Sequence, residues 1–245
     1  MTLAPAVPDS AVPGTAVRDS AARIGVLSLQ GDVREHVAVL EHLGAETVTV
    51  RRPGELAAVD GLVIPGGEST VIDRLARLTG LREPLRDAIA GGLPVLGTCA
   101  GLILLAERLR DAGPGHETIG GLDVTVRRNA FGRQAESFET DLVVPALEEL
   151  GSGGPTVRAV FLRAPLIEEV GPAAEVLATL PDGRVVAARQ RNAIGLAFHP
   201  ESTGENRFHA LFLRSVHEHR LARAARRGLS RPAAGRSPDP RPRQP

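Results

Sequence analysis

Short apolar runs alternate with amphipathic patterns along the first half of the chain. Four runs of aliphatic and β-branched residues predict buried strands, at residues 24–29, 47–50, 61–64 and 94–97. Between them, apolar residues at three- to four-residue spacing predict helices, from Asp32 to Gly44 and over residues 70–78 and 81–90. This alternation predicts an α/β fold: an open, mostly parallel, flavodoxin-like sheet with helices on both faces.

The second half of the chain is richer in glycine and in strand patterns. Strands are predicted over residues 122–127, 156–162, 175–180, 185–189 and 194–198. Pro181-Asp182-Gly183 separates two of these strands and is typical of a hairpin turn. We therefore expect an antiparallel edge on the sheet, followed by a last helix over about residues 205–220.

The ends of the chain differ in composition from its middle. No repeat or linker divides residues 23–222, so we expect a single domain there, flanked by disordered extensions at 1–22 and 223–245. The second extension holds seven Arg and one Asp, so a net charge of +6 there balances −6 in the rest. The chain contains no signal peptide and no long apolar run, so we expect a cytoplasmic protein that does not interact with membranes.

Composition excludes several kinds of chemistry. All 29 basic residues are arginine, so the chain cannot form a lysine imine or hold a phosphate through a P-loop lysine. One cysteine excludes an intrachain disulfide and any Cys-Cys metal site. The six aromatic residues are all Phe, which argues against a stacking surface for nucleic acid.

The strongest chemical motif surrounds the single cysteine. The predicted strand at 94–97 leads into Gly97-Thr98-Cys99-Ala100-Gly101, and an apolar helix containing Leu102, Ile103, Leu105 and Ala106 follows. This is the thiol form of a nucleophile elbow, in which flanking glycines permit a tight turn. The turn presents the thiol at the N-terminus of a helix, where the helix dipole favours thiolate. Cys99 is the candidate nucleophile, although free cysteines are often simply part of a core.

A cysteine nucleophile requires a base and a group that orients the base. Among seven histidines, His199 directly follows a predicted strand and so belongs to the same sheet edge as the elbow. Glu201, two residues later, is close enough to orient its imidazole. His36 and His42 fall in the first helix and His116 in a polar loop, whereas His209, His217 and His219 are expected on the surface of the last helix.

A glycine-rich loop ends the third predicted strand. Pro65-Gly66-Gly67-Glu68-Ser69 can expose backbone N–H groups to a ligand, as an oxyanion hole requires. Ser69 could equally cap the following helix in an ordinary turn.

Taken in order, six segments resemble the glutaminase subunits of two-component pyridoxal 5′-phosphate synthases, a family within the class I (triad) glutamine amidotransferases. They are residues 29–31, 65–70, 97–102, 128–134, 161–165 and 198–201. The elbow and His-Pro-Glu are typical of the whole class. Gly-Gly-Glu-Ser-Thr, Arg-Asn-Ala-Phe-Gly-Arg-Gln and Arg-Ala-Pro indicate this family within it. The resemblance implies the class I glutamine amidotransferase fold.

The resemblance also implies roles for individual residues. Cys99 would attack L-glutamine to give a γ-glutamyl thioester and ammonia, with His199 moving protons and Glu201 orienting it. Backbone N–H groups of Gly67 and Ala100 would hold the oxyanion. The positions that match glutamine-binding residues of the family are Gly67, Glu68, Ser69, Arg128, Leu162 and Arg163.

The resemblance further implies a partner. Ammonia would pass to a separate, lysine-dependent synthase subunit in a hetero-oligomer, and Gln30 would sense its docking. No cofactor or metal is expected in this chain. Three alternatives remain open from the residues: a glutaminase serving another synthase, a DJ-1-like or peptidase relative, and a non-catalytic regulatory subunit.

Overall fold

The computed structural model describes residues 21–113, 115–128, 130, 137–151 and 153–229. Its strands are β1 (Arg23–Leu27), β2 (Glu46–Val50), β3 (Gly61–Ile64), β4 (Val95–Thr98), β5 (Ala106–Arg110), β6 (Leu122–Arg127), β7 (Phe138–Val143), β8 (Thr156–Phe161), β9 (Leu166–Val170), β10 (Glu175–Thr179), β11 (Val185–Gln190) and β12 (Ala193–Leu196). They form a ten-stranded sheet in the order β2-β1-β3-β4-β12-β11-β9-β6-β5, with β10 paired to β11. Strands β7 and β8 pair separately.

The sheet has a parallel part and an antiparallel part. Strands β2, β1, β3, β4 and β12 are parallel neighbours, whereas β12, β11, β9 and β6 pair antiparallel. Pro181-Asp182-Gly183 joins the antiparallel strands β10 and β11, as the sequence predicted. The expected α/β fold with an antiparallel portion is confirmed.

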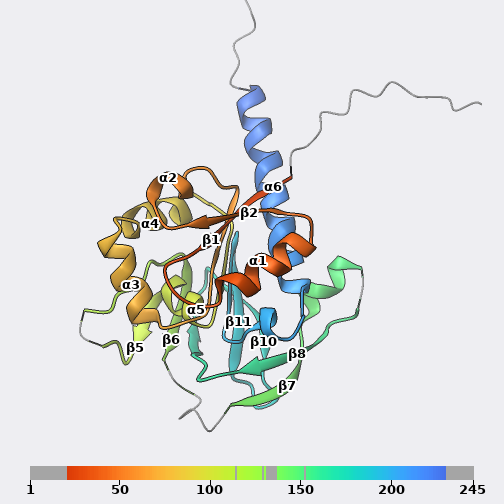
Figure 1. Cartoon of the computed structure of the whole chain (residues 1–245). Coiled ribbons are helices and arrows are strands. Elements are labelled where there is room, and N and C mark those ends of the chain that lie inside the picture. Colours follow the sequence, from red (N-terminus) through yellow and green to blue (C-terminus); the bar gives the residue numbers. More distant parts are fainter. Residues whose placement is uncertain (1–20, 114, 129, 131–136, 152, 230–245) are drawn as a thin grey trace, which may run out of the picture.

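Helices cover both faces of the sheet (Figure 1). They are α1 (Val33–His42), α2 (Pro53–Leu56), α3 (Ser69–Leu78), α4 (Arg82–Ala90), α5 (Ala100–Leu105) and α6 (Arg207–Leu229), with short 3-10 turns at Pro145–Leu150 and Pro200–Ser202. Helices α1 and α6 lie together on one face, while α3, α4 and α5 lie on the other.

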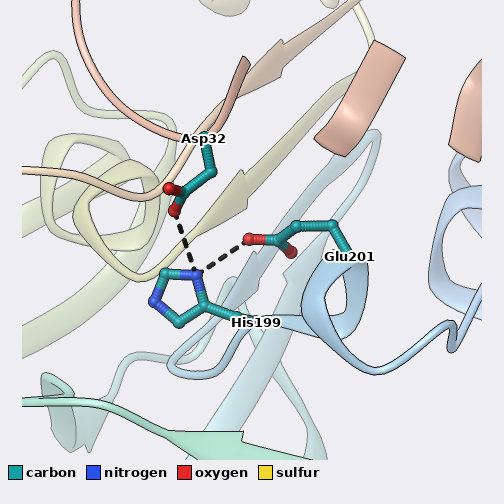
Figure 2. Close-up of side chains that lie close together, drawn as sticks. All are labelled: Asp32, His199 and Glu201. Atoms are coloured by element: carbon teal, nitrogen blue, oxygen red, sulfur yellow. Dashed lines mark hydrogen bonds and ion pairs between the residues drawn. The ribbon is translucent and has the colours of Figure 1, made fainter. Parts of the chain in front are cut away.

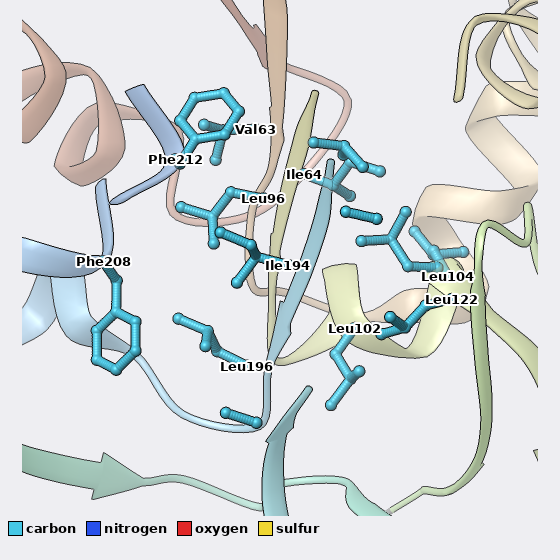
Figure 3. Close-up of a cluster of buried hydrophobic side chains, with 14 of the residues drawn as sticks. Val63, Ile64, Leu96, Leu102, Leu104, Leu122, Ile194, Leu196, Phe208 and Phe212 are labelled. Carbon is cyan, nitrogen blue, oxygen red and sulfur yellow. The ribbon is translucent and has the colours of Figure 1, made fainter. Parts of the chain in front are cut away.

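The core lies on both sides of the central strands (Figure 3). Phe208 and Phe212 of α6 pack on one side, and Leu102 and Leu104 of α5 on the other. The side chains between them have no exposed surface: Val63, Ile64, Leu96, Leu122, Ile194 and Leu196. Strands buried on both faces appear in sequence as short continuous apolar runs, which explains why they were predictable.

Two predicted boundaries are wrong. The helix after Cys99 ends at Leu105, so Ala106 begins β5, which pairs in parallel with β6. Ala-Glu-Arg-Leu-Arg favours helix locally, but strand pairing overrides that propensity.

Helix α6 continues to Leu229, so residues 223–229 are helical and not disordered. Alanine and arginine are strong helix formers even without apolar periodicity. Residues 1–20 and 230–245 lie outside the described residues. In the part of the chain that is described, every helix is too short or too polar to span a lipid bilayer.

Candidate active site

Four neighbouring strands, β1, β3, β4 and β12, bring separate segments to one edge of the sheet. Because the carboxyl ends of parallel strands meet there, residues 30–32, 66–69, 99 and 199–201 converge. They surround a cavity of about 290 Å³, which suits a small molecule. Its lining comprises Gln30, Asp32, Gly67, Glu68, Ser69, Cys99, Ile103, Arg128, Leu162, Arg163 and His199. Of the other predicted site residues, Ala100 follows Cys99 directly and Glu201 contacts His199.

Cys99 occupies a sharp turn between β4 and α5. Its backbone has φ 48° and ψ −99°, a conformation that L-residues rarely adopt. The Cys99 amide donates to the Leu196 carbonyl at 2.8 Å, which anchors the turn to β12. A Cβ atom at Gly101 would lie 2.1 Å from the Ile64 carbonyl oxygen, so only glycine lets α5 approach β3 this closely. Strand, strained residue and helix form the elbow geometry that the sequence predicted.

His199 is held by two carboxylates (Figure 2). Its Nδ1 lies 2.8 Å from Oε1 of Glu201 and 3.4 Å from Oδ2 of Asp32. The Glu201 side chain is completely buried, whereas that of Asp32 is 42% exposed at the cavity. An Nδ1–H bonded to carboxylate leaves Nε2 to accept or donate a proton at the reacting atoms.

The surroundings of His199 stabilise its charged form. Burial alone would lower the pKa of His199, but hydrogen bonds to Asp32, Cys99 and Glu201 and the charge of Cys99 raise it to about 12. An imidazolium beside a thiol favours the thiolate, which is the nucleophilic form of cysteine.

Asp32, His199 and Glu201 also place potential ligand atoms within 4.8 Å of one another. Their separations from Nδ1 are those of hydrogen bonds and ion pairs. A metal ion bound there would occupy the nitrogen that orients the base. The geometry therefore fits an oriented imidazole better than a metal centre.

The loop after β3 approaches the site through its glycines. A Cβ atom at Gly66 would lie 2.3 Å from Cε1 of His199, and Gly67 has φ 152° with its Cβ position 2.4 Å from Oε1 of Gln30. The same Gln30 oxygen accepts a hydrogen bond of 2.7 Å from the Glu68 amide. Gln30 thus holds the loop that contains Gly67. Across the cavity, Ala100 is the first residue of α5, where amide groups have no acceptor within the helix.

Charged groups line the other end of the cavity. Arg128 donates to Oε1 of Glu68 at 3.0 Å. Nearby, Arg163 has a left-handed backbone (φ 47°), and Ser69 Oγ is buried without a hydrogen-bond partner. Two arginines, one carboxylate and a free hydroxyl match the charged end of an amino acid.

Sequence reasoning missed several neighbours of the site. Asp32 was interpreted as a helix cap, but its side chain makes no cap hydrogen bond and reaches His199 instead. Ile103, assigned only to an apolar helix, lines the cavity. His209, expected on the surface, is completely buried against His36. The position of Asp32 after the same strand as Gln30 was the signal that could have revealed it.

A larger cavity, of about 610 Å³, lies at the opposite edge of the sheet. Its lining includes Gly92 and Asn192, which precede β4 and β12, together with Glu107 of β5 and Gln190 of β11. Its lining contains no cysteine and no histidine, so the smaller cavity is the better candidate for catalysis.

The chain is similar to several known proteins. The pyridoxal 5′-phosphate synthase subunit PdxT of Leifsonia xyli subsp. xyli (strain CTCB07) is 64% identical over 195 residues, covering 80% of this chain and 96% of the relative. The PdxT of Streptomyces coelicolor (strain ATCC BAA-471 / A3(2) / M145) is 55% identical over 201 residues, covering 82% and 96%.

Solved structures and a family model extend the comparison. A crystal structure described as a glutamine amidotransferase superposes with a TM-score of 0.72 at 42% identity, covering 79% of this chain and 98% of that chain. The structure of PurLQS from Thermotoga maritima, 17% identical, shares the fold with a TM-score of 0.57, covering 78% of this chain and 97% of that chain. The model of the SNO glutamine amidotransferase family matches residues 26–218. The chain therefore belongs to the SNO glutamine amidotransferase family.

Proposed function

We propose that Cys99, His199 and Glu201 hydrolyse L-glutamine to L-glutamate and ammonia, and that the chain is the glutaminase subunit of a pyridoxal 5′-phosphate synthase. The observation that carries the proposal is the cavity in which a strained cysteine lies beside a histidine held by a buried carboxylate. Relatives 55–64% identical to this chain are named as subunits of that synthase, which supports the same activity here.

The first half of the reaction uses the thiolate of Cys99. Its sulfur attacks the carboxamide carbon of glutamine, and the carbonyl oxygen becomes an oxyanion that amides of Gly67 and Ala100 stabilise. His199 then gives its Nε2 proton to the departing nitrogen. The C–N bond breaks, ammonia leaves, and a γ-glutamyl thioester remains on Cys99.

The second half regenerates the thiolate. His199, now neutral, takes a proton from water, whose oxygen attacks the thioester carbon. The C–S bond breaks and glutamate leaves, with Cys99 again as thiolate beside imidazolium. Glu201 keeps Nδ1 protonated throughout, so Nε2 is always the nitrogen that faces the reacting atoms.

The charged end of the cavity positions the substrate. Arg128 binds the α-carboxylate of glutamine, and Glu68 binds its α-ammonium. The ion pair between Arg128 and Glu68 is thereby replaced by contacts with the zwitterionic substrate. Ser69, Leu162 and Arg163 complete this part of the pocket. The side-chain amide of glutamine then extends towards Cys99.

Ammonia passes to the partner synthase subunit, which supplies the lysine that pyridoxal phosphate synthesis requires. This chain has no lysine and cannot form the imines itself. We propose that Gln30, which holds the Gly67 loop through the Glu68 amide, senses docking of that partner. We also place the reaction in the cytoplasm, where reducing conditions keep a catalytic thiol free.

Ammonia release from L-glutamine tests the proposal, measured with and without the synthase subunit. We expect release in the complex, and none above background from a Cys99→Ala complex. A wild-type complex without release would favour a regulatory subunit. Release without dependence on this synthase would favour a glutaminase that serves another enzyme.

A further inference from the structure

Two buried histidines lie directly behind the proposed triad. Both His36 of α1 and His209 of α6 have no exposed surface, and Nδ1 of His36 lies 2.8 Å from Nε2 of His209. The other nitrogen of His36, Nε2, lies 3.1 Å from Oγ1 of Thr98 and 3.6 Å from Oε1 of Glu201. The chain His209–His36 thus ends at the carboxylate that orients His199.

Both rings are neutral near neutral pH. Burial lowers the pKa of His36 well below its ordinary value, and the charges of His209 and His199 lower it further. Burial also lowers the pKa of His209 to about 4, although the charge of Glu205 acts in the opposite direction. Each ring therefore carries one N–H and one lone pair, and two proton arrangements allow a hydrogen bond between His36 Nδ1 and His209 Nε2.

One arrangement leaves a buried donor without an acceptor. If Nδ1 of His36 carried the proton, Nε2 of His209 would accept it and Nδ1 of His209 would carry the second proton. That nitrogen is buried and has no hydrogen-bond partner. The lone pair of His36 Nε2 would also face the Glu201 oxygen. A buried N–H without an acceptor is costly, so this arrangement is unfavourable.

The opposite arrangement gives both imidazole N–H groups an acceptor. Nε2–H of His209 donates to Nδ1 of His36, and Nε2–H of His36 donates to Oγ1 of Thr98 while pointing its positive end towards Glu201. The nitrogen without a partner, Nδ1 of His209, then bears only a lone pair.

We propose that His36 and His209 are positioning residues for the glutaminase reaction, forming a neutral relay that fixes Oε1 of Glu201 against Nδ1 of His199. The inference rests on the proposed role of the triad. Glu201 needs such support because its other oxygen, Oε2, has no hydrogen-bond partner. Without the relay, the carboxylate can rotate away from His199, and the imidazolium loses its closest partner.

Because its two histidines are neutral, the relay supports Glu201 without adding positive charge to the site. The titratable groups that face it are Glu201 and His199 beside His36, Asp32 at the same His199 nitrogen as Glu201, and Glu205 near His209. A charged His36 would compete with His199 for Glu201. A neutral one orients the carboxylate and leaves His199 as the cation of the site.

Substitutions of His36 test the relay in the complex with the synthase subunit. His36→Leu removes the N–H. We expect kcat to fall about tenfold, which is the usual effect of losing a residue that orients a catalytic ligand. KM for glutamine should not change, because His36 does not line the cavity. The alkaline limb of the kcat/KM profile should move to lower pH, because a freed Glu201 stabilises imidazolium less.

Two further variants separate orientation from packing. His36→Gln keeps an N–H donor at similar reach and should restore most of kcat. His42→Leu, at an exposed position of the same helix, is the matched control and should behave as wild type. A His36→Leu complex with wild-type kcat and pH profile would overturn the proposal.

Imidazole NMR of the wild-type chain gives a test that does not depend on any variant folding. Two-bond ¹H–¹⁵N spectra distinguish the two tautomers of neutral histidine. We expect His36 and His209 both to carry the proton on Nε2, and a proton on Nδ1 of His36 would contradict the relay. If the wild-type complex releases no ammonia, the proposed function fails, while these spectra still decide the proton arrangement.

Discussion

Gly66 has no side chain, and this leaves room for the ring of the proposed base. A Cβ atom there would lie 2.3 Å from Cε1 and 3.0 Å from Nδ1 of His199. The two groups come from different strand ends, so the contact is invisible in the sequence. The structure shows it because β3 and β12 both neighbour β4.

Gly66→Ala should therefore inactivate the site without unfolding the protein. The new methyl group displaces the imidazole, and a shift of about 1 Å at a catalytic group can cost about a hundredfold in rate. Ammonia release in the complex measures the loss, and thermal unfolding checks the fold. Gly54→Ala is the control, because a Cβ there meets nothing within 4 Å. Equal activity of the two variants would contradict the predicted clash.

Replacing Asp32 should change the pKa of His199 more than it changes the rate of the reaction. Its hydrogen bond raises that pKa, so Asp32→Asn should lower the pKa and move the alkaline limb of the glutaminase profile to lower pH. The rate at neutral pH should fall only a few-fold, because Glu201 still orients the ring. Glu35→Gln, at an exposed position in the first turn of α1, is the control. A wild-type profile for Asp32→Asn would show that the contact does not stabilise imidazolium.

The proposed site residues were predictable to different degrees. Cys99 has a local signature, since glycines at fixed spacing follow a strand and precede a helix. His199 was distinguished by its position at a strand end. Arg128 could be proposed only from family resemblance, because an arginine after an arginine-rich strand has no local signature. Asp32 and His36 were missed because their contacts exist only once α1 packs beside the end of β12.

Among the elements, α5 depends most on a close backbone approach. Gly101→Ala would place a methyl group 2.1 Å from the Ile64 carbonyl oxygen, and backbone cannot move aside as a flexible side chain can. We expect a loss of about 3 kcal/mol in the free energy of unfolding, at the upper end for overpacked cores. Urea denaturation measures it, again with Gly54→Ala as reference. A loss below about 0.5 kcal/mol would show that α5 can shift without cost.

The central strands were easier to predict than the peripheral ones. Strands β1, β3 and β4 are buried on both faces over almost their whole length, so their sequences are mostly apolar and their bounds were close to correct. Strands β5, β7 and β9 have exposed positions that interrupt the apolar pattern, and the sequence predicted none of them. Their residues pair with neighbours that are distant in sequence, which local propensity does not encode.

At the scale of the whole molecule, buried neutral histidines should make stability depend on pH. The pKa of His209 is lowered to about 4, so the unfolded chain binds a proton more readily than the folded one. The resulting loss in the free energy of unfolding is absent above about pH 6.5 and grows as pH falls towards 4. It should reach about 3 kcal/mol there, because each pH unit between the two pKa values contributes about 1.4 kcal/mol.

His209→Gln should flatten this pH dependence relative to wild type. Chemical denaturation between about pH 7 and pH 4 gives the free energy of unfolding of both proteins. His217→Gln, an exposed position on the same helix, is the matched control and should keep the wild-type slope. If His209→Gln and wild type lose stability equally over this range, His209 does not stay neutral in the folded protein.

The place of β12 in the sheet has a consequence for the order in which the protein becomes active. This strand lies between β4 and β11, yet it is the last strand of the ten-stranded sheet along the chain. During synthesis the strand that carries the nucleophile must therefore wait for a partner that emerges much later, and such long-range pairing is slow. In the proposed mechanism Cys99 has no base until then, because His199 follows β12. A nascent or prematurely terminated chain would consume no glutamine, so wasteful release of ammonia is avoided by topology alone.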